Sequence, residues 1–196
     1  MSILKVARVT RAPSAGLAMV GVFWGGFAAL MPDIKAYAGA SDAAFGLIMM
    51  LSAAGSMASM FMAPKLYASA GRATLPLVGL ILTFAFLPPI WASDLYRLSF
   101  AVLLMGACVG MMDITSNIRT TAIEAAEGMS LMNYAHAMFS FAFGATALGG
   151  GATTSKGSIR SSSNRKSRTA SNHAVRGGAL LERIVGSALL QRATLF

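Results

Sequence analysis

Charged residues are scarce in this sequence. Asp, Glu, Lys and Arg together make up 12% of its 196 residues, whereas a soluble domain carries about a quarter. Hydrophobic residues make up 56%, and the mean hydropathy is +0.64. These residues stand in long uninterrupted runs, which a bilayer solvates better than a soluble core does. The composition therefore argues against an ordinary soluble domain and predicts a membrane protein.

Residues that carry enzyme chemistry are equally sparse. Cys108 is the single cysteine and lies within an apolar run, which excludes an intramolecular disulfide framework. The sequence shows no cluster at metal-ligand spacing, no glycine-rich phosphate loop before a lysine and serine, and no paired nucleophile and base. We therefore expect a protein that is not an enzyme and that uses no cofactor and no metal.

Acidic residues are missing chiefly from one end of the chain. The net charge of +9 raises the question of nucleic acid or anionic lipid. Residues 1–151 hold eight basic and six acidic residues, whereas 152–196 hold eight basic and one acidic. We expect no nucleic-acid partner, and we divide the chain into a cytoplasmic flank at 1–14, a membrane region at 15–151 and a basic, disordered tail at 152–196.

Five nearly charge-free runs are each long enough to cross a hydrocarbon core of about 30 Å as a helix. They predict an all-α membrane protein with five transmembrane helices at residues 15–34, 43–64, 73–92, 98–118 and 130–151. A cleaved signal peptide is the competing interpretation of the first run, because Ala36-Tyr37-Ala38 resembles a cleavage site. That run is longer than a usual signal-peptide core, and further spans follow it.

The basic residues outside these runs predict the orientation. With the N-terminus inside, six of them fall on the inner side and only Lys35 and Arg97 on the outer side. Because basic residues are retained in the cytoplasm, we expect a cytoplasmic N-terminus in the plasma membrane, or inner membrane, of a bacterium.

The fourth run, 98–118, contains the most informative residues. Gly106, Gly110, Asp113 and Asn117 are spaced by four, three and four, so they share one helical face. Glycines let a neighbouring helix approach closely, and an acid in lipid costs roughly 3 kcal/mol or more unless a protein partner or water surrounds it. Asp113 and Asn117 are therefore candidates for a substrate or proton pathway, the alternative being a structural hydrogen-bonded pair.

Other candidates lie in the first and fifth runs. Gly21 and Gly25 have the small-xxx-small spacing of a helix contact. Trp24 is a candidate for stacking on a ligand, with packing as its alternative. His136 is a candidate proton relay, with ordinary interfacial hydrogen bonding as its alternative. In the second run, Ser52, Ser56 and Ser59 repeat at helical spacing beside a glycine, which predicts a packing stripe.

Residues 16–151 resemble the N-terminal half of a major facilitator superfamily transporter, of the sugar-permease-like kind. The resemblance rests on Gly25–Pro32, on Gly71-Arg72 between the second and third runs, and on Gly110-Met111-Met112-Asp113 with Asn117, followed by Glu124 and then Asn133–Ser140. At the second place the family has Gly-x-Leu-Ala-Asp-Arg-x-Gly-Arg-Arg, and this chain lacks its acid.

The resemblance implies a secondary active transporter for a small solute, and we expect symport with a coupling proton. In that family two six-helix halves enclose a central site, so the partners implied are a solute, a coupling proton, membrane lipid and a missing C-terminal half. Gly71 and Arg72 then belong to a cytoplasmic gating loop. The fifth run ends where a sixth is expected.

The tail suggests why the sixth run is absent. From about Thr153 the sequence changes to Ser, Arg, Gly and Ala, and five spans from a cytoplasmic start place its basic charge outside. We therefore expect a truncated or frameshifted transporter fragment that is not functional alone. The alternative is a small five-span membrane protein whose basic tail binds anionic lipid or a partner protein.

Overall fold

A computed structural model describes residues 3–164 of the chain and the side chains of residues 3–150. The described residues form helices joined by short connections and contain no strand. The elements in order are α1 (Ile3–Tyr37), α2 (Asp42–Ala70), the 3-10 turn η1 (Gly71–Ala73), α3 (Thr74–Ala85), α4 (Leu87–Trp91), α5 (Leu95–Glu127) and α6 (Met132–Asn164).

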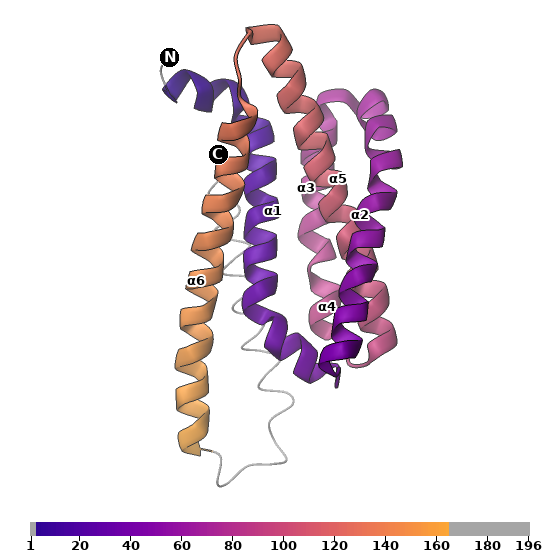
Figure 1. The fold of residues 1–196 in the computed structure, drawn as a ribbon, viewed down its shortest axis with the longest axis vertical. Helices are drawn as coiled ribbons and strands as arrows, with labels where there is room; N and C mark the ends of the chain where they lie inside the picture. Colours follow the sequence, from indigo (N-terminus) through magenta and orange to yellow (C-terminus); the bar gives the residue numbers. More distant parts are fainter. Residues whose placement is uncertain (1–2, 165–196) are drawn as a thin grey trace.

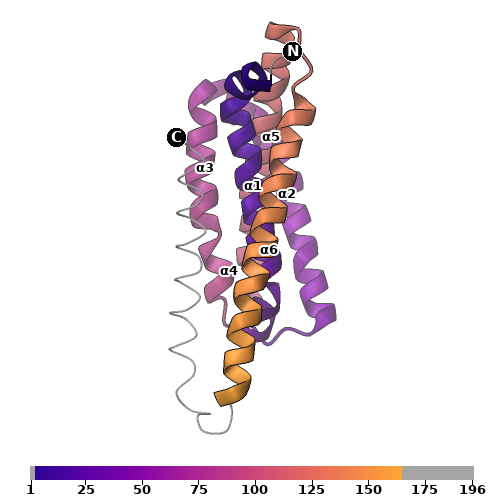
Figure 2. The same ribbon diagram turned by 90° about the vertical axis from the view of Figure 1, so that its left-hand side faces the viewer.

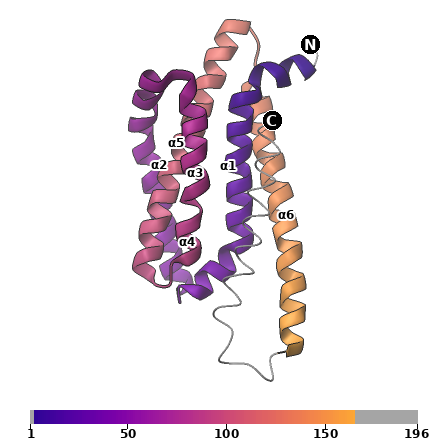
Figure 3. The ribbon, with the colours of Figure 1, turned by 180° about the vertical axis from the view of Figure 1, so that it is seen from behind.

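The helices form an elongated bundle built around two helix pairs (Figure 1). α1 packs mainly on α6, and α2 packs mainly on α5, while α1 and α3 both contact α5. The chain folds back at η1, so that α3 returns beside α2 (Figures 1 and 3). Viewed from the side, α6 lies in front of α1 and continues beyond it at one end (Figure 2).

The all-helical membrane architecture agrees with the sequence-based prediction, but the count of five spans does not follow from the structure. Within the described residues, three helical segments are long and apolar enough to cross a membrane: Ile3–Tyr37, Asp42–Trp91 and Leu95–Glu127. The second segment contains the fold-back at η1. α6 is not among the three, because polar residues such as Asn133, His136 and Ser140 dilute its apolar character.

The helices extend beyond the runs from which they were predicted. α1 begins at Ile3 and α5 continues to Glu127, because the polar residues that flank the apolar runs also adopt helical structure. α6 continues to Asn164 and so crosses the predicted start of the tail at residue 152; no proline interrupts this stretch. Residues 165–196 of the predicted tail lie outside the described part of the chain.

The ends of the helices follow local capping chemistry. The Ser41 side chain accepts a hydrogen bond from the Ala44 N–H at the start of α2, and Asp94 accepts one from the Arg97 N–H at the start of α5. Gly128 adopts the left-handed conformation, φ +64°, that ends α5. The break between α3 and α4 falls at Phe86, ahead of the Pro88-Pro89 pair.

The core lies where α1, α3 and α5 meet. Its largest fully buried side chains include Phe27, Leu82, Val102 and Met105, and the rings of Phe23 and Phe86 meet edge to face at 4.8 Å. The outer surface is also apolar, with large exposed side chains on most helices: Leu47, Met57, Phe61, Phe84, Phe100 and Phe141. Such an exterior suits lipid rather than water.

Candidate functional site

The contact between α2 and α5 brings two backbones together at glycines. A Cβ atom at Gly106 would overlap the carbonyl oxygen of Ser52, and one at Gly110 would lie 2.8 Å from the Cα of Ser56. Any larger side chain at either position would force the helices apart. The structure therefore places Gly106 and Gly110 on the face of α5 that touches α2.

Two serines of α2 strengthen this contact with hydrogen bonds to the backbone of α5. The Ser56 hydroxyl donates to the carbonyl oxygen of Gly106 at 2.9 Å, and the Ser59 hydroxyl donates to that of Ala107 at 2.6 Å. The close approach at the glycines makes these bonds possible, because a short serine side chain cannot bridge a wider gap. The serine stripe of the second run thus faces α5.

The contact between α1 and α6 depends on two glycines of α1, Gly21 and Gly25. A Cβ atom at Gly21 would overlap the carbonyl oxygen of Phe139, and one at Gly25 would lie 2.5 Å from that of Phe143. The glycines of α1 thus let α6 approach along its backbone. This contact fixes the position of α6 along α1, and with it the position of His136.

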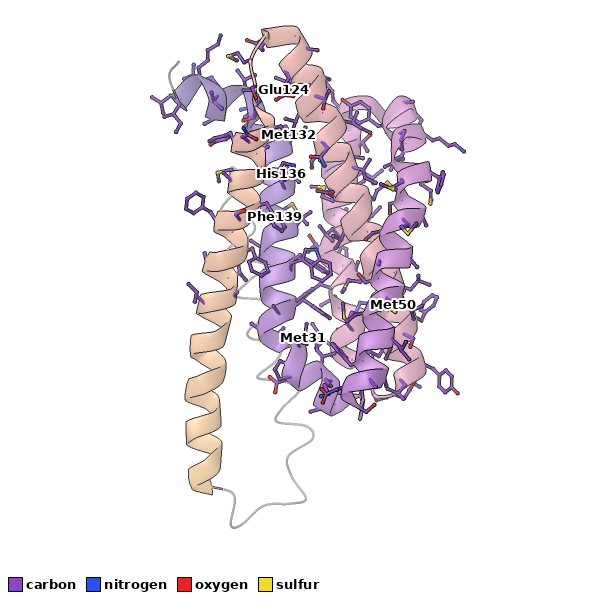
Figure 4. The ribbon with its side chains drawn as sticks, in the orientation of Figure 1. Met31, Met50, Glu124, Met132, His136 and Phe139 are labelled. Carbon is purple, nitrogen blue, oxygen red and sulfur yellow. The ribbon has the colours of Figure 1, made fainter. Side chains whose placement is uncertain are left out.

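Asp113, Asn117 and His136 lie close together in the structure. Asp113 and Asn117 are both half-buried on α5. Asn117 lies one turn from Asp113 on α5, close enough to affect its carboxylate, and the exposed His136 of α6 acts on that carboxylate at longer range, without forming an ion pair with it. Figure 4 shows His136 at the same end of the bundle as Glu124 and Met132. An acid, an amide and an imidazole from two helices therefore share one region.

Several buried polar atoms near this region have no hydrogen-bond partner among the described residues. They are Asn117 Oδ1 and the hydroxyls of Ser14 and Ser116; a fourth such atom, the Ser52 hydroxyl, lies between α2 and α5. Buried polar atoms are nearly always hydrogen-bonded in native proteins. Asn117 and Ser116 therefore retain the capacity to bind a solute or water beside Asp113.

Trp24 lies in a different environment from this trio. It is half-buried on α1, and its ring meets those of Phe23 at 6.1 Å and Phe27 at 6.0 Å, edge to face. Within residues 3–150, no ring contact or hydrogen bond joins Trp24 to Asp113. The observed contacts are those of a packing residue, so the ligand-stacking role stays a prediction.

Gly71 and Arg72 form the turn between α2 and α3. Gly71 has φ +55° and donates its N–H to the carbonyl oxygen of Tyr67, a conformation that favours glycine. Arg72 is exposed, and no ion pair in the described part of the chain includes it. The turn geometry explains the glycine, whereas the gating role stays a prediction.

Glu124 was not singled out as a site residue from the sequence, yet it organises the connection between α5 and α6. Its carboxylate oxygen Oε1 accepts hydrogen bonds from the backbone N–H groups of Leu131 at 2.5 Å and Met132 at 2.8 Å. α5 is longer than the hydrocarbon core, and Glu124 lies beyond the predicted span 98–118. The two N–H donors hold the pKa of Glu124 below its usual value.

The position of Glu124 in the sequence, close to the start of the next helix, could have indicated its role in the connection. It stands shortly before Gly128, a helix-ending residue, and α6 begins at Met132 without an acidic residue in its first turn. A carboxylate that reaches across such a turn satisfies N–H groups that the helix itself leaves unpaired. His136 lies one turn further along α6, so Glu124 helps to fix its position.

Comparison with known proteins identifies this helical membrane protein more closely. It is 32% identical over 127 residues to an uncharacterized MFS-type transporter of Yersinia pestis, a match that covers 64% of this chain and 32% of the relative. It is 28% identical over 134 residues to an uncharacterized transporter of Sinorhizobium fredii, covering 66% of this chain and 35% of the relative. The resemblance to the major facilitator superfamily is thereby confirmed.

The match covers only part of each relative. The chain spans about a third of the length of the curated relatives that it matches. No family model matches the sequence, and no solved structure matches it. Both relatives are named as transporters, and the described part of this chain has three helical segments that are long and apolar enough to cross a membrane.

Proposed function

We propose that this chain is the N-terminal part of a secondary active transporter that moves a small solute across the membrane, and that it does not act alone. The family resemblance and the apolar helices support a transporter. A central site in this family lies between two halves, and this chain spans about a third of its relatives. The missing half is therefore a required partner, together with membrane lipid.

The grouping of Asp113, Asn117 and His136 is the observation that carries the proposal. Placing a carboxylate within a membrane helix costs free energy, so such a residue is expected to have polar neighbours and a functional role. Here the neighbours are an amide on the same helix and an imidazole on α6. Asn117 can also contact a solute, because its Oδ1 has no hydrogen-bond partner among the described residues.

The chemistry of these groups suits solute binding coupled to a proton. Asp113 can carry a negative charge or a proton, and the imidazole of His136 can attract its carboxylate. When a proton or a solute reaches Asp113, that attraction weakens. α6 is then free to shift against α5. In this way the trio would couple occupancy to the relative position of two helices, as symport requires.

Replacing the carboxylate tests this role. The experiment uses a full-length relative that retains the aspartate–asparagine pair, with uptake measured in proteoliposomes. Asp113→Asn keeps the shape and the hydrogen-bonding capacity but removes the titratable charge, so we expect proton-coupled uptake to fall at least tenfold. Asp33→Asn, at an exposed acid near the end of α1, is the matched control. Unchanged uptake in Asp113→Asn would leave the pair with a structural role only.

We further propose a cytoplasmic N-terminus in the bacterial inner membrane. The support is the excess of basic residues on the inner side of the predicted topology. A reporter that is active only in the cytoplasm should give signal when fused after Arg72 and none when fused after Asp94. The opposite pattern would reverse the orientation.

The nucleotide sequence tests the proposal that the chain is a fragment. Reading the other two frames beyond codon 150 should reveal a sixth apolar run and six more downstream. If both frames contain only stop codons and no apolar runs, the five-span protein with a lipid- or partner-binding tail becomes the better account.

A further inference from the structure

The first residues of α1, 3–12, form a distinct part of the surface that the transport proposal does not use. We call them the N-terminal basic segment. Figures 1 and 3 show that the start of α1 bends away from the axis of the bundle. Pro13 lies inside the helix at this point, and proline kinks a helix because it removes one backbone hydrogen bond and crowds the preceding turn.

One side of the N-terminal basic segment packs on the protein and the other is open. Val6 and Thr10 are buried, whereas Ile3 and Leu4 are 70% and 76% exposed. The Thr10 hydroxyl donates to the carbonyl oxygen of Val6 at 2.7 Å, so it is satisfied within the helix. The buried side fixes the segment in place, and two large apolar side chains therefore remain on its outside.

The exposed side of the segment is also cationic. Residues 3–12 contain three basic and no acidic residues, namely Lys5, Arg8 and Arg11, all exposed. Lys5 Nζ lies 3.5 Å from a carboxylate oxygen of Glu127, at the end of α5. Among the described residues no ion pair includes Arg8 or Arg11. These two arginines are three residues apart and therefore neighbours on the helix surface.

The depth of the segment relative to a membrane follows from the sequence. The predicted first span begins at residue 15, just after this segment, and a helix that crosses the bilayer from that point would hold residues 3–11 at the level of the lipid headgroups. A helix that presents apolar side chains beside cations at this level binds through burial of its apolar side and attraction to anionic lipid. Arginine suits phosphate because its planar guanidinium can donate two parallel hydrogen bonds.

We propose that the N-terminal basic segment is a binding site for anionic phospholipid. Arg8 and Arg11 contact the headgroup phosphates, and Ile3 and Leu4 enter the adjoining acyl region. Lys5, through Glu127, ties the occupied segment to the end of α5. The lipid thereby braces the connection between α5 and α6, which Glu124 organises from the other side. This inference rests on membrane insertion of the chain, but not on its transport activity or its orientation.

The test measures lipid binding to the purified full chain in detergent by native mass spectrometry, with phosphatidylglycerol and phosphatidylcholine as probes. We expect tighter binding of phosphatidylglycerol. Each cation near a lipid surface contributes about 1 kcal/mol, or about fivefold, so Arg8→Gln/Arg11→Gln should weaken phosphatidylglycerol binding about 25-fold. Circular dichroism and gel filtration establish that each variant is folded.

A matched control separates a site from general surface charge. Lys65→Gln/Arg72→Gln removes the same charge from the last part of α2 and from η1, at two exposed residues, and should leave phosphatidylglycerol binding nearly unchanged. Equal loss in both double variants would overturn the proposal, as would equal binding of the two lipids by the parent chain. This experiment measures lipid binding and not transport, so its result does not depend on whether the transport proposal is correct.

A second variant tests the apolar part of the site. Ile3→Ser/Leu4→Ser should weaken binding of phosphatidylglycerol while leaving its preference over phosphatidylcholine. The soluble headgroup analogue glycerophosphoglycerol should bind much more weakly than the lipid. If this analogue binds as tightly as the lipid, or if the double serine variant binds lipid unchanged, the segment is an anion site and the proposed lipid contact is wrong.

Discussion

The two helix pairs of this protein, α1–α6 and α2–α5, both pack closely at glycines but differ in the hydrogen bonds at the contact. In both, glycines allow backbones to touch: Gly106 on α5 against α2, and Gly21 on α1 against α6. In the α2–α5 pair, serine hydroxyls then bond across the contact. In α6, by contrast, the Ser140 and Thr146 hydroxyls bond carbonyl oxygens of their own helix.

The helices of the two pairs are held together by different kinds of contact. α2 and α5 are joined by close packing and by hydrogen bonds, whereas α6 relies on its contact with α1 and on the Glu124 hydrogen bonds at its start. α6 also carries His136, and α5 carries Asp113. Asp113 and His136 therefore lie on helices that are held by different contacts.

Breaking the α2–α5 contact should have the largest effect. Gly106→Leu places a side chain where the Ser52 carbonyl stands, so we expect a loss of about 3 kcal/mol in the free energy of unfolding. The control is Gly144→Leu on α6, because no described atom lies within 4 Å of a Cβ at Gly144. Denaturant unfolding in micelles, followed by circular dichroism, measures both. Equal losses in the free energy of unfolding for the two variants would show that the α2–α5 contact contributes no more to stability than an open position on α6.

Breaking the α1–α6 contact should have a smaller and more local effect. Gly21→Leu would push α6 away from α1 at Phe139, and we expect a loss of about 2 kcal/mol that is confined to α6. Hydrogen exchange should show weaker protection of the α6 amides and unchanged protection of α2 and α5. Loss of protection in all helices alike would mean that the pairs are not independent.

The Glu124 hydrogen bonds should make the start of α6 sensitive to acid. The pKa of Glu124 is lower in the folded protein than in the unfolded chain, so its stabilisation is fully present above the unfolded value and is lost as the pH falls through the folded value. Protection of the Leu131 and Met132 amides, relative to intrinsic exchange, should fall over that acidic range. Glu124→Gln should show weaker protection with no such pH dependence; an unchanged profile would contradict the assignment.

The serine bridges should have the smallest effect. Ser59→Ala removes the hydrogen bond to Ala107, and membrane hydrogen bonds between helices contribute about 0.6 kcal/mol on average. Ser140→Ala removes a hydroxyl that bonds only its own helix, so its effect should lie near zero. A larger loss for Ser140→Ala than for Ser59→Ala would reverse the comparison between the pairs.

The sequence predicted well those features that depend on one helix at a time. The spacing of Asp113 and Asn117 put them on one face, and the structure makes them neighbours. The charge-free runs fall largely within the observed helices, but only three described segments are long and apolar enough to cross a membrane, so the count of five is not confirmed. Their ends were less predictable, because flanking residues such as those of 119–127 continue the helix once capping and packing permit it.

Features that depend on two helices were not predictable from spacing. The approach of His136 to Asp113 is set by the position of α6 along α1, which the Phe139 and Phe143 backbones determine. The Glu124 hydrogen bonds depend on how the chain turns at Gly128. Likewise, the serine stripe on α2 predicted a contact, but only the fold shows that its partner is α5.

The order in which the helices pair has a consequence for biosynthesis. α1 pairs with α6 and α2 with α5, so the pairs are nested, and the first of the described helices is matched with the last of them. At about 5–20 residues per second, the glycine face of α1 waits on the order of ten seconds in the bilayer for its partner. During this interval the nascent chain exposes Gly21 and Gly25 to lipid or to the insertion machinery. Synthesis that stops before α6 would leave that face permanently uncovered, whereas the α2–α5 contact would already be complete.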